Sequence, residues 1–295
     1  MSHGRDLRAQ TLGRMMSGSK PLFVICVGTG WSATTPLYRT LQDTKIANAF
    51  IKESNILCPN LDFSEKYKAT KNNIYLNPTI DNYITFLHEY YQSIADEYRG
   101  VCDFTTSYAT LPSDIISTFA DKLNNNFNVK ILMIFRDPVR RLFSHISHLT
   151  NTSPNAFMKE ILFYLRKIPN ELVYPTQNYN YKLRNFEPFL FANYQLIYDT
   201  WRSFFDTHYI IMEDLWAGRN NELERLNTFL GANITQVHEN VYYPDQGANP
   251  PKLAGLADQW TSDTENLDPK LLHLARRMMA RHYEFTDAWN IDEWL

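Results

Sequence analysis

The chain lacks most of the features that mark specialised protein classes. Its 295 residues contain only three cysteines, Cys26, Cys58 and Cys102, with no CxxC pair, which predicts reduced core thiols. No apolar run approaches the ~20 residues that cross a bilayer, and residues 1–20 contain no apolar stretch typical of a signal peptide. We therefore expect a cytoplasmic protein without a membrane span, whose residues 1–20 form a flexible arm.

An excess of charge of either sign is also missing. Lys and Arg total 29 and Asp and Glu total 32, which gives a net charge of −3. A chain this close to neutral has no global basic field, so nucleic acid is not expected as a partner. The 14 prolines and 10 glycines are scattered. With no linker to divide the chain, we expect residues 21–295 to form a single domain.

Short apolar runs alternate with segments of helical periodicity. The runs at 21–27 and 129–135 are apolar on both alternating faces, as expected for strands covered by helices on both sides. This alternation predicts an α/β fold, a three-layer sandwich around a central, mostly parallel sheet, with ligands bound beyond the C-terminal ends of the strands. The other predicted strands are 47–51, 101–104 and 208–212, and the predicted helices are 35–42, 79–98, 112–124, 138–149, 155–166, 187–205, 220–230 and 268–283.

The segment GTGWSATT, residues 28–35, follows the first strand and leads into a helix. Glycines permit a tight turn, hydroxyls donate hydrogen bonds, and the first N–H groups of the helix attract an anion. The P-loop pattern GxxxxGK[ST] is only half met, which disfavours a P-loop kinase of nucleoside triphosphates. The segment predicts a phosphate-binding loop made of Gly28, Thr29, Gly30, Trp31, Ser32, Ala33, Thr34 and Thr35.

A second group of anion-binding side chains follows the strand at 129–135, in the run RDPVRRLFS. Arg136 stands at the tip of the strand, while Arg141 and Ser144 are three residues apart on one helical face. A guanidinium gives a permanently charged fork and serine a short hydroxyl donor. Arg136 and Ser144 can therefore converge on one anion.

The run RDPVRRLFS resembles the segment that binds the 3′-phosphate in the sulfotransferase superfamily, whose members use 3′-phosphoadenosine 5′-phosphosulfate (PAPS). This resemblance implies that Arg136 and Ser144 hold the 3′-phosphate and that residues 28–35 hold the 5′-phosphosulfate, with Trp31 in place of a Lys or Arg and Ala33 in place of a Gly. It further implies a P-loop-containing nucleotide-hydrolase-like sulfotransferase fold, closest to the carbohydrate and heparan-type enzymes. Weaker similarities in the family's order are DFTTSY at 103–108, the helix from Tyr194 to Phe205, IMEDL at 211–215 and the helix residues Leu226, Phe229, Leu230 and Gly231.

Sulfuryl transfer needs a general base for the acceptor. The resemblance implies that Glu53, in ANAFIKESNIL, is this base, and Asp103, at the end of a predicted strand, is the second candidate. The reaction does not inherently need a metal. The pair His145 and His148 is therefore interpreted as packing or surface rather than as a zinc site.

The leaving phosphate also needs positive charge or hydrogen bonds at its developing negative oxygen, and the expected cations are missing. Trp31 replaces the loop cation, and Phe104 replaces a second Lys that many relatives carry. Lys45, Lys52 and Lys252 are the candidate replacements, of which Lys252 lies in a loop, GANPPKL, where relatives close over the nucleotide.

We therefore expect an enzyme that transfers a sulfuryl group from PAPS to a hydroxyl or amine of a carbohydrate, lipid or small molecule. The missing cations leave an alternative open: a catalytically inactive protein that binds PAPS or its product, adenosine 3′,5′-bisphosphate (PAP), or acts as a scaffold.

Overall fold

The centre of the computed structural model is a four-stranded, fully parallel sheet. The structure describes residues 20–30, 32–58, 79–138, 141 and 194–238. Within them the strands lie in the order β2-β1-β3-β4. Their bounds are Leu22–Cys26 for β1, Gly100–Asp103 for β2, Asn128–Phe135 for β3 and Asp206–Ile211 for β4.

Strand β1 is buried on both faces because its two alternating sets of side chains are both apolar, and the same holds for β3 from Ile131 to Phe135. Phe23 and Ile25 of β1 pack into the core on one side of the sheet, and Val24 and Cys26 pack on the other. All four side chains are excluded from solvent. A strand of this kind is stable only between two layers of helices.

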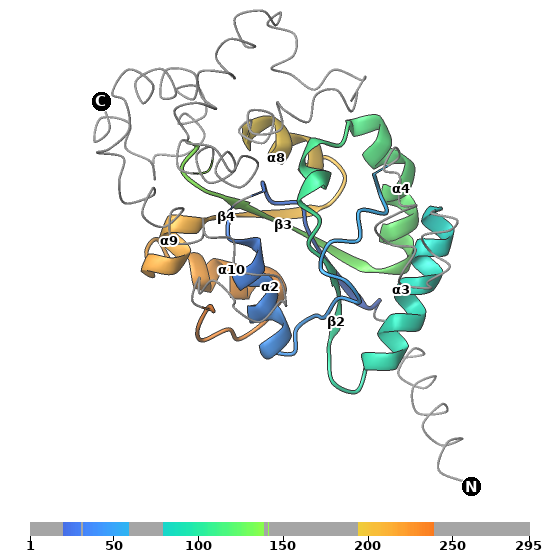
Figure 1. Cartoon of the computed structure of the whole chain (residues 1–295), viewed down its shortest axis with the longest axis horizontal. Coiled ribbons are helices and arrows are strands. Elements are labelled where there is room, and N and C mark those ends of the chain that lie inside the picture. The colour runs from blue at the N-terminus through green and yellow to red at the C-terminus, as the bar shows by residue number, and fades with distance from the viewer. Residues whose placement is uncertain (1–19, 31, 59–78, 139–140, 142–193, 239–295) are drawn as a thin grey trace, which may run out of the picture.

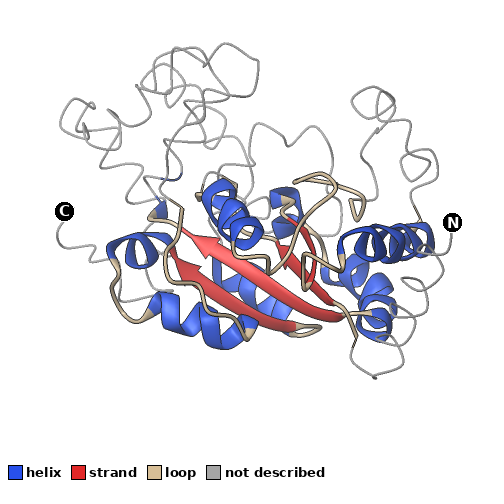
Figure 2. Cartoon of the chain, turned by 90° about the horizontal axis from the view of Figure 1, so that it is seen from below, coloured by secondary structure: helices blue, strands red, loops and turns tan. Residues whose placement is uncertain are grey.

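Helices supply both of these layers (Figures 1 and 2). The predicted three-layer α/β sandwich with a parallel sheet is confirmed. A short 3₁₀ helix, Thr106–Thr110, follows β2. One face is covered by α3 (Ile80–Ile94), α4 (Ser113–Asn126) and α8 (Tyr194–Arg202), and the other by α2 (Thr34–Asp43), α9 (Met212–Ala217) and α10 (Glu222–Leu230).

The predicted strand at 47–51 is wrong. Asn48 makes an isolated bridge to Val101 of β2, and the next backbone hydrogen bond along this segment runs from the Phe104 N–H, directly after β2, to the Lys52 carbonyl at 2.7 Å. Between these contacts the chain bends away, and the Phe50 ring is 47% exposed. The apolar residues in this segment therefore follow the edge of the sheet without extending it.

Several predictions fall outside the described residues. They include the helices at 155–166 and 268–283, most of the helix at 138–149 and nearly all of the N-terminal arm. That residues 21–295 form one domain stays a prediction. All three cysteines are free thiols, two of them buried as predicted, while Cys58 is partly exposed. No helix in the described ranges is long and apolar enough to cross a membrane.

The strand order places a topological switch point between β1 and β3. From β1 the chain continues to β2 on one side, then returns to β3 on the other side. The chain after β1 enters α2 on one face of the sheet, and the chain after β3 reaches α8 on the other. The place between two such strand ends is the usual ligand-binding position in open α/β folds. Residues 28–35 and Arg136 follow these two strand ends.

Candidate functional site

The loop after β1 is fastened to the neighbouring strand β3. The Thr29 hydroxyl lies 2.7 Å from the Ser32 hydroxyl and donates to the Ile134 carbonyl at 3.3 Å. Gly28 makes this close approach possible, because a Cβ atom at that position would stand 2.9 Å from the Ile134 backbone nitrogen. The glycine predicted for a tight turn is thus required for loop-to-strand packing.

The turn into α2 has the form expected of an anion-binding loop. Ala33, the residue before α2, has the left-handed backbone conformation, with φ of 59°. No side chain caps the N-terminus of α2, and its first turn carries no acidic residue. The first N–H groups and the positive end of the helix dipole are consequently available to an anion held by the loop.

The chain leaving β3 brings two arginines to the same end of the sheet. Arg136 follows the strand end, and the Asp137 N–H donates to Glu213 Oε1 at 2.9 Å. Arg141 lies one helical turn further on and is fully buried. Burial lowers the pKa of Arg141, with a smaller lowering from the nearby Arg136, while the Tyr194 hydroxyl acts in the opposite direction.

Tyr194, the first residue of α8, links these two segments. Its hydroxyl donates to the Arg136 carbonyl at 2.6 Å. It also hydrogen-bonds with the Arg141 side chain and lies close to the Thr29 hydroxyl. Burial raises the pKa of Tyr194, so the hydroxyl keeps its proton. The sequence predicts Tyr194 on a helix, and no signal in the sequence indicates that its hydroxyl reaches residues 58 and 165 positions away.

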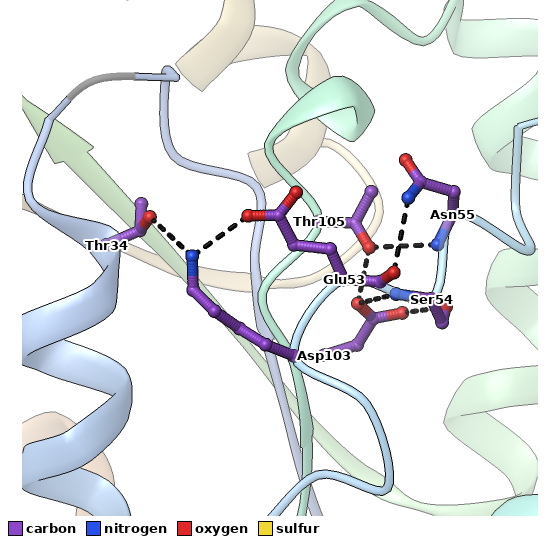
Figure 3. A network of polar contacts seen from close by, with 7 residues as sticks. Thr34, Glu53, Ser54, Asn55, Asp103 and Thr105 are labelled. Carbon is purple, nitrogen blue, oxygen red and sulfur yellow. Dashed lines mark hydrogen bonds and ion pairs between the residues drawn. The ribbon is translucent and has the colours of Figure 1, made fainter. Parts of the chain in front are cut away.

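Glu53 lies beside the start of α2 (Figure 3), and the Lys52 ammonium bridges Glu53 and Thr34. Lys52 Nζ donates to Thr34 Oγ1 at 3.3 Å and to Glu53 Oε1 at 2.9 Å. The Glu53 side chain is 43% exposed, so its carboxylate is accessible to a substrate. Asn55 Nδ2 donates to the Glu53 carbonyl at 3.2 Å and supports the backbone of this segment.

Asp103 lies beneath this segment, with a side chain that is almost completely buried. Burial is the largest cause of the raised pKa of this carboxyl, and hydrogen bonds from surrounding hydroxyls lower it in part. Five donors surround its two oxygens (Figure 3 shows those from residues 54 and 105): the Ser54 N–H and Oγ, Thr105 Oγ1, Tyr83 OH and Tyr108 OH, at 2.5–3.3 Å. A carboxylate in this setting organises the backbone from Ser54 onward.

The structure thus gathers much of the predicted site at the C-terminal ends of β1, β2 and β3. The described residues of the loop, Lys52 and Glu53 adjoin each other, and Arg136 stands at the neighbouring strand end. Among the described residues, no three His, Cys, Asp or Glu side chains could hold a metal ion. Trp31, Ser144, Lys252, His145 and His148 lie outside the described residues.

No protein-family model matches the sequence, and no curated protein matches it. Among solved structures, the chain is similar to a sulfotransferase from Alicyclobacillus acidocaldarius, with a TM-score of 0.53 and 16% identity over 94% of this chain and 99% of that one. It also matches the sulfotransferase domain of an olefin synthase from Synechococcus PCC 7002, with a TM-score of 0.49 and 15% identity over 92% and 96% of the two chains. The likeness to the first of these confirms the predicted sulfotransferase fold.

Proposed function

We propose that this chain, which has the sulfotransferase fold, transfers a sulfuryl group from PAPS to a hydroxyl or amine of an acceptor. One observation carries the proposal. The anion-binding loop after β1 and the arginines after β3 adjoin at the switch point of the sheet, joined through the Tyr194 hydroxyl. A nucleotide with phosphates at both its 5′ and 3′ positions is the ligand class that uses two such anion sites.

The residues present suit the two ends of this nucleotide. The loop offers the Thr34 hydroxyl together with the uncapped start of α2, which fits a 5′-phosphosulfate. The Thr29 and Ser32 hydroxyls bond to each other, and Thr29 also bonds to Ile134, which holds the loop in shape. Arg136 offers a forked cation for the 3′-phosphate. The other proposed nucleotide ligands are Gly28, Gly30, Trp31, Ala33, Thr35, Ser144 and Lys252.

Glu53 is the proposed general base. PAPS supplies an activated sulfuryl group when bound. Glu53 would accept the proton of the acceptor as the acceptor oxygen or nitrogen bonds to sulfur, a role for which its exposed carboxylate is suited. Asp103, the second candidate, is surrounded by five donors and far less accessible, which favours a positioning role beneath Ser54.

Calorimetry with PAP and with 5′-AMP tests the proposal at fixed salt. We expect PAP to bind at least about 10-fold more tightly, because only PAP has the 3′-phosphate that a charged donor can hold. Arg136→Met should reduce PAP binding to the level of 5′-AMP. Equal and weak binding of both nucleotides to the unmodified protein would overturn the proposal.

A transfer assay then separates an enzyme from the inactive nucleotide-binding alternative. Labelled PAPS is incubated with a panel of glycans, lipids and phenols. Transfer that disappears in Glu53→Gln, with PAP affinity retained, supports catalysis by this chain. Tight PAP binding without transfer or PAPS hydrolysis on any acceptor favours the inactive alternative.

A further inference from the structure

We infer that Lys52 supplies the positive charge that the loop after β1 lacks, and acts as a catalytic residue toward the 5′-phosphosulfate; this rests on the proposed function. The loop GTGWSATT has no Lys or Arg of its own. Transfer of a sulfuryl group leaves negative charge on the phosphate oxygen, and a positioned cation stabilises that charge. A lysine from another segment that faces the loop would supply this charge.

Lys52 occupies this position. Its Nζ is 3.3 Å from the hydroxyl of Thr34, the first residue of α2, and its side chain is only 24% exposed. An ammonium group has three protons, and Thr34 and Glu53 accept two of them. The third can be donated to a phosphate oxygen held at the start of α2.

The backbone of Lys52 is fixed on both sides, so the ammonium is held in place rather than left on a free loop. On the sheet side, the Lys52 carbonyl accepts from the Phe104 N–H at 2.7 Å. On the other side, Ser54 donates both its N–H and its hydroxyl to the buried Asp103. Lys52 and Glu53 are therefore held between two anchors at the C-terminal end of β2.

Lys45 and Lys252, the other two candidate cations, are not placed beside the start of α2 by the structure. Lys45 follows the C-terminal end of α2, the end opposite to Thr34, and its ammonium pairs with Glu97 and Tyr98. Ten helical residues span about 15 Å, so Lys45 is too far from the start of α2 to reach the same anion. Lys252 lies outside the described residues. Lys45 therefore serves as a matched control.

The ion pair with Glu53 places the cation beside the proposed base. In the step, the acceptor atom forms a bond to sulfur, and the bond from sulfur to the bridging phosphate oxygen breaks with its electron pair going to that oxygen. The acceptor proton goes to Glu53. Lys52 donates a hydrogen bond to the phosphate oxygen and keeps its own proton throughout, so atoms and charge balance without another reactant.

A binding experiment isolates the 5′ contact from the rest of the nucleotide. The ligands are PAP and adenosine 3′-monophosphate, which lacks the 5′-phosphate, measured by calorimetry against the wild type, Lys52→Met and Lys45→Met. We expect Lys52→Met to weaken PAP by about 10-fold or more, the usual effect of removing a hydrogen bond to a charged group. Affinity for adenosine 3′-monophosphate should not change, and Lys45→Met should match the wild type with both ligands.

Three outcomes contradict the inference or its premise in distinguishable ways. If wild-type protein does not bind PAP, the proposed function itself fails. If PAP binds normally and Lys52→Met changes neither affinity, or lowers both equally, Lys52 does not face the 5′-phosphate. If Lys52→Met does not fold, Lys52→Arg replaces it in the test because it keeps the positive charge. This variant should still bind PAP more tightly than adenosine 3′-monophosphate. Loss of that preference in a folded arginine variant contradicts the inference.

Discussion

The Tyr194 hydroxyl donates a hydrogen bond to the carbonyl oxygen of Arg136 at 2.6 Å. The Tyr194 ring also stacks on Phe135, with ring centroids 4.3 Å apart, so the hydroxyl is held in place by packing. Because the same hydroxyl contacts Thr29 and Arg141, it couples the positions of the two proposed phosphate-binding segments. Tyr194 is thus a positioning residue at the centre of the candidate site.

Tyr194→Phe should destabilise the fold and weaken nucleotide binding together. The variant removes the donor to Arg136 and one partner of the buried Arg141, which costs about 1–3 kcal/mol of unfolding free energy. Urea unfolding gives this value, and calorimetry with PAP gives the change in affinity. Tyr198→Phe, on the same helix, is the control, and an equal loss of PAP affinity in both variants would contradict the positioning role.

Glu53→Gln and Asp103→Asn should distinguish the proposed catalytic role of Glu53 from the structural role of Asp103. We expect Glu53→Gln to abolish transfer with its unfolding free energy unchanged, because its carboxylate is partly exposed. Asp103→Asn places an amide N–H among five donors, and we expect a loss of about 1–3 kcal/mol of unfolding free energy with some transfer retained. A stable Asp103→Asn variant that binds PAP normally and has no transfer activity would instead identify Asp103 as the base.

Ala33→Gly should stabilise the protein. A non-glycine residue with φ of 59° is strained by about 1–2 kcal/mol, and glycine relieves this strain at some cost in unfolded-state entropy. The expected net gain is about 0.5–1 kcal/mol, or a rise in Tm of roughly 1–4 °C. Ala95→Gly is the control, since Ala95 has a helical φ of −63° and the same change should destabilise there. Equal losses at both positions would contradict the left-handed conformation of Ala33.

His208 should make the protein less stable in mild acid. Burial is the main cause of the lowering of its pKa to about 4, with a further contribution from Arg225 and an opposing one from Asp206. Above pH ~6.5 the imidazole is neutral in both folded and unfolded chains, so its contribution to stability is complete. Between pH ~6.5 and 4 the unfolded chain binds a proton that the folded chain does not, and stability falls by up to about 3 kcal/mol.

His208→Phe tests this pH dependence, because a phenyl ring can keep the stacking on Phe229 and cannot be protonated. Urea unfolding of wild type and variant at pH 7, 6, 5 and 4.5 gives the two slopes. The variant should lose less stability on acidification than the wild type. Identical slopes would show that the burial of His208 does not govern this range.

The candidate site was only partly accessible from the sequence. The loop at 28–35 and Arg136 were found because each directly follows an apolar strand and carries residue types that bind anions. The strand predicted at 47–51 was wrong, because apolar residues that pack along the edge of a sheet have the same composition as a strand. Asp103 was identified as a residue at a strand end, while its hydrogen bonds from Ser54 and Tyr83, which are 49 and 20 residues away, had no local signal.

The sequence by itself determined the layer architecture, since strands apolar on both faces must lie between helices. It also determined which strand ends carry phosphate-binding residue types. Only the tertiary structure decided that Lys52 meets Thr34 and that Tyr194 meets Arg136. The physical reason is that periodicity reports whether a side chain is buried, whereas its partner is set by strand order and by where each crossover returns the chain to the sheet.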